Sequence, residues 1–130
     1  MATEIDHLGI AVRSIDEALR FYGEALGMAV SGRETVETEK VNVAMLPAGT
    51  RVELLEATDA ESPIAKFLEK RGPGLHHVAF KVDDLLAVIG KLKAEGARLL
   101  NEPHRGAGGH LYVFVHPASA GGVLIELIQK

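Results

Sequence analysis

The chain has 130 residues, of which 47% are hydrophobic and 25% charged, and it contains no cysteine. This is the composition of a soluble globular protein, and it excludes disulfides and thiolate chemistry. A formal net charge of −4 argues against a general nucleic-acid binder, which needs a basic face. The N-terminal residues lack signal-peptide features and no apolar run could cross a bilayer, so we expect a cytoplasmic location without membrane contact.

The first half of the chain carries the signals of one strand, one helix and three further strands. Apolar residues alternate over 6–12, as in a strand, and Ser14 then begins a helix with Glu17 in the capping-box position. Gly27 is the expected end of this helix. Three strands are expected downstream, near 28–35, 40–46 and 51–57.

The second half repeats this order after a helical bridge. In the bridge, Ser62 and Pro63 predict the start of a helix. A strand over 76–82 and a helix beginning after Asp84 and ending near Gly96 follow. Three strands are then expected near 97–101, 111–115 and 122–128. The sequence therefore predicts one α+β domain over 1–130, with a first βαβββ module at 1–57, a helical connector at 58–74 and a second module at 75–130.

Each half carries one histidine and one glutamate at matching places. His7 matches His77 at the start of each half, and Glu53 matches Glu126 in a later strand. Taken singly, each residue has a stronger structural explanation, such as a pairing of Glu126 with a buried Arg51. Taken together, two imidazoles and two carboxylates in a duplicated unit indicate a site for Zn²⁺, Co²⁺, Ni²⁺, Mn²⁺ or Fe²⁺. Four protein ligands would leave two octahedral positions for a chelating substrate.

These residues resemble the vicinal oxygen chelate superfamily, and within it most closely the methylmalonyl-CoA epimerase family. The resemblance covers nearly the whole chain. Its motifs are His7 to Val12, Glu53 to Glu56, Asp59 to Leu68, Gly74 to Phe80, Phe114 to Pro117 and Gly121 to Leu127. It implies a glyoxalase-like fold, in which two tandem βαβββ modules form a curved mixed sheet that encloses a metal site.

The resemblance also implies an isomerase of propionate metabolism that equilibrates the (R)- and (S)-epimers of methylmalonyl-CoA. By that resemblance His7, Glu53, His77 and Glu126 hold a divalent ion, with Co²⁺ favoured and Zn²⁺, Ni²⁺ or Mn²⁺ as alternatives. The ion would stabilise an enolate formed by removal of the α-proton, and Glu126 would be both ligand and catalytic base. An acyl-CoA substrate and a homodimer are expected on the same ground.

Two features bear on how far the family pattern applies. Some relatives carry a second catalytic glutamate where this chain has Val43, which cannot transfer a proton. A glycine-rich segment resembles the family's substrate loop, although a flexible hairpin turn explains it equally well. That segment consists of Arg105, Gly106, Ala107, Gly108 and Gly109.

Three other functions share the expected fold. Glyoxalase I, a lactoylglutathione lyase, uses the same set of four ligands, but its last loop resembles Asp-Pro-Asp-Gly where this chain has His116-Pro117-Ala118-Ser119. Ring-cleaving dioxygenases commonly hold iron with two histidines and one carboxylate. Non-enzymatic small-molecule-binding modules of the bleomycin-resistance type generally lack the ligands that are present here.

Overall fold

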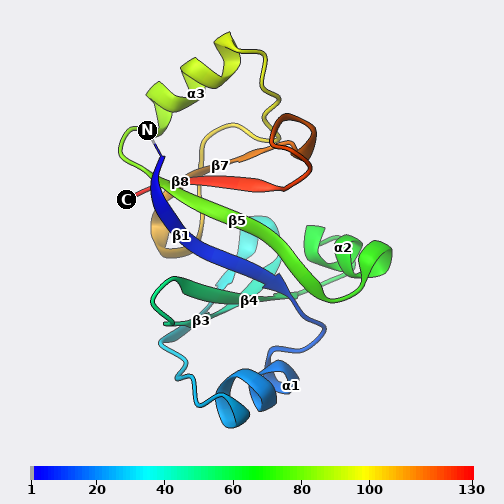
Figure 1. Cartoon of the computed structure of the whole chain (residues 1–130). Coiled ribbons are helices and arrows are strands. Elements are labelled where there is room, and N and C mark those ends of the chain that lie inside the picture. The colour runs from blue at the N-terminus through cyan, green and yellow to red at the C-terminus, as the bar shows by residue number, and fades with distance from the viewer. Residues whose placement is uncertain (1) are drawn as a thin grey trace. The chain divides into compact units, whose positions relative to one another are not determined.

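The structure, a computed structural model, describes residues 2–130 (Figure 1). Residue contacts divide the chain into two compact units: one contains the chain up to His7 together with His77–Lys130, and the other contains Leu8–His76. Strands β1 (Ala2–Ala11) and β5 (Gly74–Val82) each run through both units. The unit boundaries therefore fall inside two strands, whereas the sequence placed the module boundaries at the ends of the connector.

The unit of Leu8–His76 contains an antiparallel ladder in which β2 pairs with β3 and β3 with β4. The hydroxyl of Ser14 caps the first helix by accepting from the N–H of Glu17 at 3.2 Å. Ser62 caps the helix predicted in the connector, with Pro63 at its first position, as the sequence predicted. The elements after β1 are α1 (Ile15–Leu19), η1 (Arg20–Ala25), β2 (Gly32–Val36), η2 (Glu37–Glu39), β3 (Val41–Leu46), β4 (Arg51–Ala57) and α2 (Pro63–Arg71).

The first predicted helix changes its hydrogen-bonding pattern half-way. After α1 the segment η1 is a π-helix, and the N–H of Leu26 donates to the carbonyl of Phe21 at 2.9 Å. The N–H of Met28 donates back to Tyr22 at 3.0 Å, so this residue belongs to the helix end and not to a strand. The prediction of a strand from 28 was wrong for this reason, because β2 begins only at Gly32.

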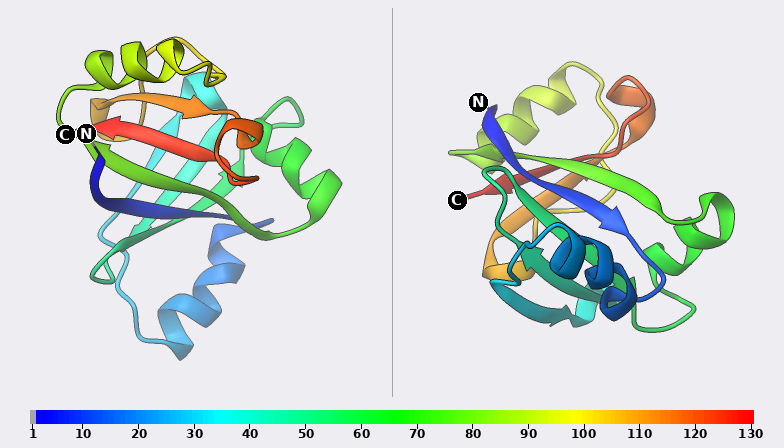
Figure 2. Two further views of the ribbon diagram at one scale, coloured as in Figure 1. Left: turned by 45° about the horizontal axis from the view of Figure 1, so that its top comes forward. Right: turned by 60° about the horizontal axis from the view of Figure 1, so that its bottom comes forward.

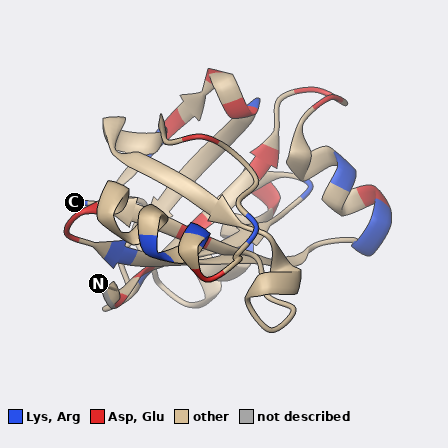
Figure 3. Cartoon of the chain, turned by 90° about the horizontal axis from the view of Figure 1, so that it is seen from above, with Lys and Arg blue, Asp and Glu red and all other residues tan. Residues whose placement is uncertain are grey.

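The last turn of α2 is basic (Figure 3, blue). Its basic residues are Lys70 and Arg71. Positive charge at a helix C-terminus interacts favourably with the helix dipole. The guanidinium carbon of Arg71 also lies 5.9 Å from the ring centre of Phe67. The structure thus gives these cations a local role at the helix end.

The other unit contains β5, α3 (Leu85–Ala94), β6 (His104–Arg105), η3 (Ala107–Gly109), β7 (Leu111–Val115), η4 (Pro117–Ser119) and β8 (Ile125–Gln129). β5 and β8 are parallel, whereas β7 is antiparallel to both β8 and β6. Helix α3 packs on one face of these strands (Figure 2). Its Leu85 and Ile89 join Val82, Val113 and Leu127 in a buried apolar cluster.

The strand predicted at 97–101 does not form. The pairing there is limited to a bridge between Leu99 and Val115, with backbone hydrogen bonds from Leu100 to Phe114 and from His116 to Arg98. The short β6 is the second strand of this half. The side-chain oxygen of Asn101 accepts from the N–H of Phe114 at 2.8 Å, in place of a backbone carbonyl. Pro103, just before β6, has no N–H to donate to a ladder.

Hydrogen bonding orders the eight strands as β2-β3-β4-β1-β5-β8-β7-β6. The sheet is mixed because β5 and β8 are parallel. Both halves have the order β-α-β-β-β, so the predicted α+β class with two βαβββ modules is confirmed. Within residues 2–130, no helix is long and apolar enough to cross a membrane.

We expect one cooperative unfolding transition for the whole chain. The start of β1, up to His7, belongs to the unit of His77–Lys130, and the start of β5 belongs to the unit of Leu8–His76. A cut in the connector therefore separates each unit from a part of itself, so neither fragment contains a complete unit. Urea unfolding followed by far-UV and near-UV circular dichroism should therefore give superimposable curves. Fragments 1–57 and 75–130 should be unfolded when separate, and fragments that fold and melt reversibly alone would contradict this expectation.

Candidate metal centre

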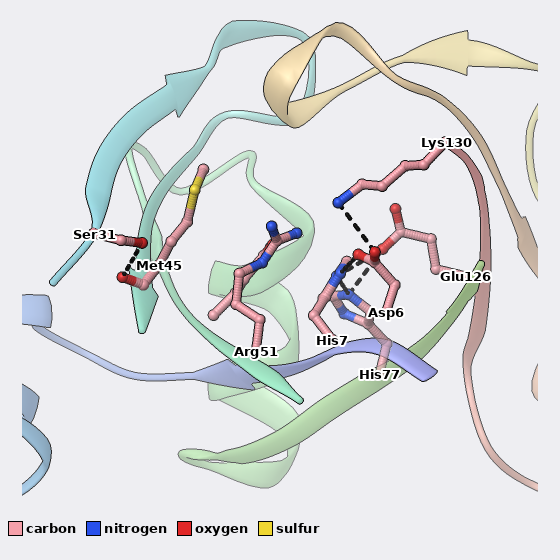
Figure 4. Close-up of polar contacts among 9 residues, drawn as sticks. Asp6, His7, Ser31, Met45, Arg51, His77, Glu126 and Lys130 are labelled. Carbon is pink, nitrogen blue, oxygen red and sulfur yellow. Dashed lines mark hydrogen bonds and ion pairs between the residues drawn. The ribbon is translucent and has the colours of Figure 1, made fainter. Parts of the chain in front are cut away.

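Three of the four predicted metal ligands converge inside one unit (Figure 4). They are His7 from β1, His77 from β5 and Glu126 from β8, and all three are buried. The two Nε2 atoms lie 3.1 Å apart. Oε1 of Glu126 lies 3.3 Å from Nε2 of His7 and 2.9 Å from Nε2 of His77. Three donor atoms thus meet at one point, as a shared ion requires.

The strand register explains why these side chains meet. The parallel pairing of β5 with β8 places Ala79 opposite Glu126, and Ala79 shares its strand face with His77. On the other side of β8, Phe114 of β7 lies opposite Glu126. The ring of Phe114 meets that of His77 edge-on, with the centres 5.4 Å apart. A small residue and an aromatic ring therefore frame the donor atoms with apolar surface.

The carboxylate of Glu126 is strongly favoured in its ionised form. Burial by itself raises the pKa of this carboxyl, but hydrogen bonds and charge interactions with His7 and His77 outweigh it and lower the pKa from 4.5 to about 2. An ionised carboxylate with two imidazoles is a borderline donor set, suited to Zn²⁺, Co²⁺, Ni²⁺, Mn²⁺ or Fe²⁺.

The hydrogen bonding around His7 also suits a metal ion. Nδ1 of His7 donates to Oδ2 of Asp6 at 2.7 Å, so in the neutral ring, without a proton shared with Glu126, Nε2 carries the lone pair. Nε2 of His77 and Oε1 of Glu126 both lie beside that lone pair. A divalent ion could accept an electron pair from each of the three atoms, so the residues present fit such an ion.

Glu53, the fourth predicted ligand, belongs to the other unit. It is buried on β4, where its Oε2 lies 2.7 Å from Nη2 of Arg51. The charge that faces Glu53 is thus Arg51, whereas Glu126 faces two histidines. Ligation by Glu53 stays a prediction, and it would have to compete with this ion pair.

Val43 lies in an apolar part of the same unit as Glu53. In the β3–β4 register Met45 is opposite Glu53 and Val43 is opposite Leu55, so all four residues share one sheet face. Val43 is buried in a cluster with Leu55 and Ile64. Val43 therefore lies in apolar surroundings and itself offers no proton-transfer group, and its match to a second acid of some relatives stays a prediction.

The glycine-rich segment is a turn held by its own hydrogen bonds. Nη1 of Arg105 donates to the carbonyl of Gly109 at 2.9 Å, and the N–H of Gly106 donates to the carbonyl of His110 at 3.0 Å. A Cβ atom on Gly106 would lie 2.9 Å from the ring of Tyr112, so no side chain fits there. These constraints explain the turn, and its predicted contact with substrate stays a prediction.

Two residues that were not predicted as part of the site, Asp6 and Lys130, lie behind His7. Asp6 contacts His7 directly, and Nζ of Lys130 lies 3.0 Å from Oδ1 of Asp6. Burial favours a raised pKa for Asp6, but hydrogen bonds from His7 and Lys130 hold that pKa well below its usual range. The adjacency of Asp6 and His7 was a visible signal, whereas nothing local in the sequence marks Lys130.

Known proteins are similar to this chain over most of its length. A model of the Glyoxalase/Bleomycin resistance protein/Dioxygenase superfamily matches residues 6–114. The uncharacterised protein YqjC of Bacillus subtilis is 44% identical over 96% of this chain and 91% of its own length. The ethylmalonyl-CoA/methylmalonyl-CoA epimerase of Cereibacter sphaeroides is 38% identical, with 99% of each chain covered.

Solved structures give the same result. Methylmalonyl-CoA epimerase from Mycobacterium tuberculosis has a TM-score of 0.93 at 39% identity, covering 99% of this chain and 89% of that chain. A methylmalonyl-CoA epimerase in complex with methylmalonyl-CoA and NH4+ has a TM-score of 0.94 at 37% identity, covering 100% and 96%. The chain therefore belongs to the glyoxalase/bleomycin resistance protein/dioxygenase superfamily, and within it to the methylmalonyl-CoA epimerase family.

Proposed function

We propose that the chain is a metal-dependent epimerase that interconverts (R)- and (S)-methylmalonyl-CoA. The observation that carries the proposal is the buried convergence of His7, His77 and Glu126 in a chain that matches named epimerases over nearly its whole length. Their substrate has a thioester carbonyl and a carboxylate on one carbon, which makes the proton on that carbon acidic and gives two oxygens for chelation.

Different residues of this unit would bind the ion, remove the α-proton and exclude water. When bound, a divalent ion supplies a Lewis acid that favours negative charge on the thioester oxygen. His7 and His77 hold the ion through their Nε2 atoms. Glu126 is ionised, so it can take the α-proton, and a carboxylate has two oxygens, of which one can face the ion while the other accepts the proton. Ala79 and Phe114 present apolar surface that keeps water away and strengthens these interactions.

The return of a proton to the opposite face needs a different group. Some relatives have a glutamate at the position of Val43, which cannot serve here. A single base, Glu126, therefore serves one face directly, solvent supplies the proton to the other face, and Glu126 releases its proton to solvent. This makes the two epimers unequal as substrates.

Several finer assignments belong to the proposal. Glu53 is the fourth ligand, supported by its burial and its matching place in the duplicated half. Co²⁺ is the favoured ion, on the family resemblance. The turn at 105–109 contacts the acyl-CoA, the protein is a cytoplasmic homodimer, and it acts in propionate metabolism, all on the same resemblance.

Turnover of three substrates by metal-loaded protein tests the proposal. We expect conversion of (S)-methylmalonyl-CoA to the (R)-epimer, and no isomerisation of the methylglyoxal–glutathione hemithioacetal that glyoxalase I uses. Two histidines and one carboxylate also form the donor set of iron oxygenases, so oxygen uptake with Fe²⁺ and a catechol is the third assay. Turnover of the hemithioacetal or catechol without epimerisation would refute the proposal, and a purified protein that takes up no metal would favour a binding module.

A further inference from the structure

A chain of polar contacts extends from the metal centre to the residue that follows β8 (Figure 4). Oδ2 of Asp6 lies 2.7 Å from Nδ1 of His7, and Nζ of Lys130 lies 3.0 Å from Oδ1 of the same carboxylate. The side chain of Asp6 is 9% exposed and that of Lys130 is 22% exposed. Because the carboxylate of Asp6 is largely shielded from water, these contacts orient it more strongly than the same contacts would at the surface.

The contact with Asp6 decides which nitrogen of His7 can bind a metal. A neutral imidazole has one N–H, and only the other nitrogen can donate an electron pair to an ion. The carboxylate of Asp6 can only accept, so Nδ1 of His7 is the donor and Nε2 keeps the lone pair. Nε2 is also the atom that lies 3.1 Å from Nε2 of His77 and 3.3 Å from Oε1 of Glu126. Asp6 therefore selects the tautomer and the ring orientation that ligation requires.

Lys130 in turn fixes Asp6. With Oδ2 on His7 and Oδ1 on Lys130, both carboxylate oxygens have partners, and rotation of the carboxylate would break one of the two contacts. Lys130 directly follows β8, four residues after Glu126 and on the same face by strand alternation. β8 thus supplies the ligand Glu126, and the residue that follows it is the cation that contacts Asp6.

The same unit contains a second ion pair of a lysine with a carboxylate, and this one is an ordinary surface contact. Nζ of Lys81 lies 3.6 Å from Oε1 of Glu4, whose side chain is 64% exposed. Such exposed ion pairs contribute little to stability. The pair of Lys130 with Asp6 is shorter, more buried and joined to a candidate ligand, which assigns it a role at the metal centre.

We propose that Asp6 and Lys130 are positioning residues, which together hold His7 with its proton on Nδ1 and its Nε2 directed at the ion. The proposal rests on the metal centre of the proposed function. Loss of such an outer partner lowers metal affinity by about 10–100-fold in known sites. We expect a loss of this size for Asp6→Asn, a smaller loss for Lys130→Met, and recovery in Lys130→Arg, which restores the cation.

The test is titration of metal-free protein with Zn²⁺ by calorimetry, with Lys81→Met as the control, and nitrogen NMR of the His7 ring. The unmodified protein, Lys81→Met and Lys130→Arg should bind with similar affinity and show Nδ1 protonated. Asp6→Asn and Lys130→Met should bind more weakly, with a mixture of His7 tautomers. Lys130 lies at the end of a strand, so its variants test the proposal even if Asp6→Asn fails to fold.

Two results would overturn the proposal, and they are distinguishable. Asp6→Asn or Lys130→Met binding Zn²⁺ as tightly as the unmodified protein, with the His7 tautomer unchanged, would show that the two residues do not position the ligand. Unmodified protein that binds no Zn²⁺ would remove the metal centre itself.

Discussion

Replacement of Glu126 by glutamine should lower the rate of epimerisation by about 10²–10⁴-fold, the usual contribution of a general base. The glutamine keeps an oxygen that can ligate the ion but cannot accept the α-proton. Metal content, measured by elemental analysis, should therefore fall much less than the rate of conversion of (S)-methylmalonyl-CoA. The comparison of the two quantities separates ligation from proton transfer.

Glu53→Gln is the matched control for this variant. It makes the same chemical change at the matching position of the other half, where Glu53 is paired with Arg51. Because glutamine keeps an oxygen that can ligate the ion, we expect most of the activity to remain. A Glu126→Gln variant that keeps both its metal and most of its epimerase activity would show that another group is the base.

Replacement of His77 by alanine should remove metal and activity together. His77 supplies one of the three donor atoms that converge, and its Nε2 is the closer of the two imidazole contacts to Glu126, at 2.9 Å. Without it, the ionised Glu126 is left with one histidine, and only two of the three convergent donors remain to hold a divalent ion. Elemental analysis and the epimerase assay on the same preparation measure both losses.

The neighbouring His76 gives the control for this second variant. It alternates to the opposite face of β5, where its ring meets that of Phe67 edge-on with the centres 5.0 Å apart. His76→Ala should therefore keep its metal and its activity. Full metal occupancy in a His7→Ala, His77→Ala double variant would contradict the site.

The parts of the structure that the sequence predicted correctly depend on local patterns. Ser14 and Ser62 are followed at fixed spacing by the groups that they cap, and the duplicated His7 and His77 lie on strands with clear alternation. The predictions failed where a distant partner decided the outcome. The strand predicted at 97–101 is reduced to one bridge, and beyond it the side chain of Asn101 accepts from the N–H of Phe114, which no periodicity within that segment reveals.

The metal centre was also predictable where its pattern is local, and not where a distant partner decides the contact. Duplication placed four residues in matching positions, and three of them converge in the described structure. The pattern did not show that Arg51, two residues before Glu53, pairs with that carboxylate. Nor could it show Lys130 beside Asp6, because the two residues lie at opposite ends of the chain and only strand pairing brings them together.

Exchange of the α-proton with solvent tests the central claim most directly. Each epimer of methylmalonyl-CoA is incubated in D₂O with metal-loaded protein, and the loss of the α-proton signal is followed by proton NMR against a sample without protein. We predict that the protein accelerates exchange and forms the other epimer, and that the two epimers exchange at different rates because Glu126 serves one face and Val43 offers no proton-transfer group. An α-proton signal that persists from both epimers, as it does without protein, would contradict the account.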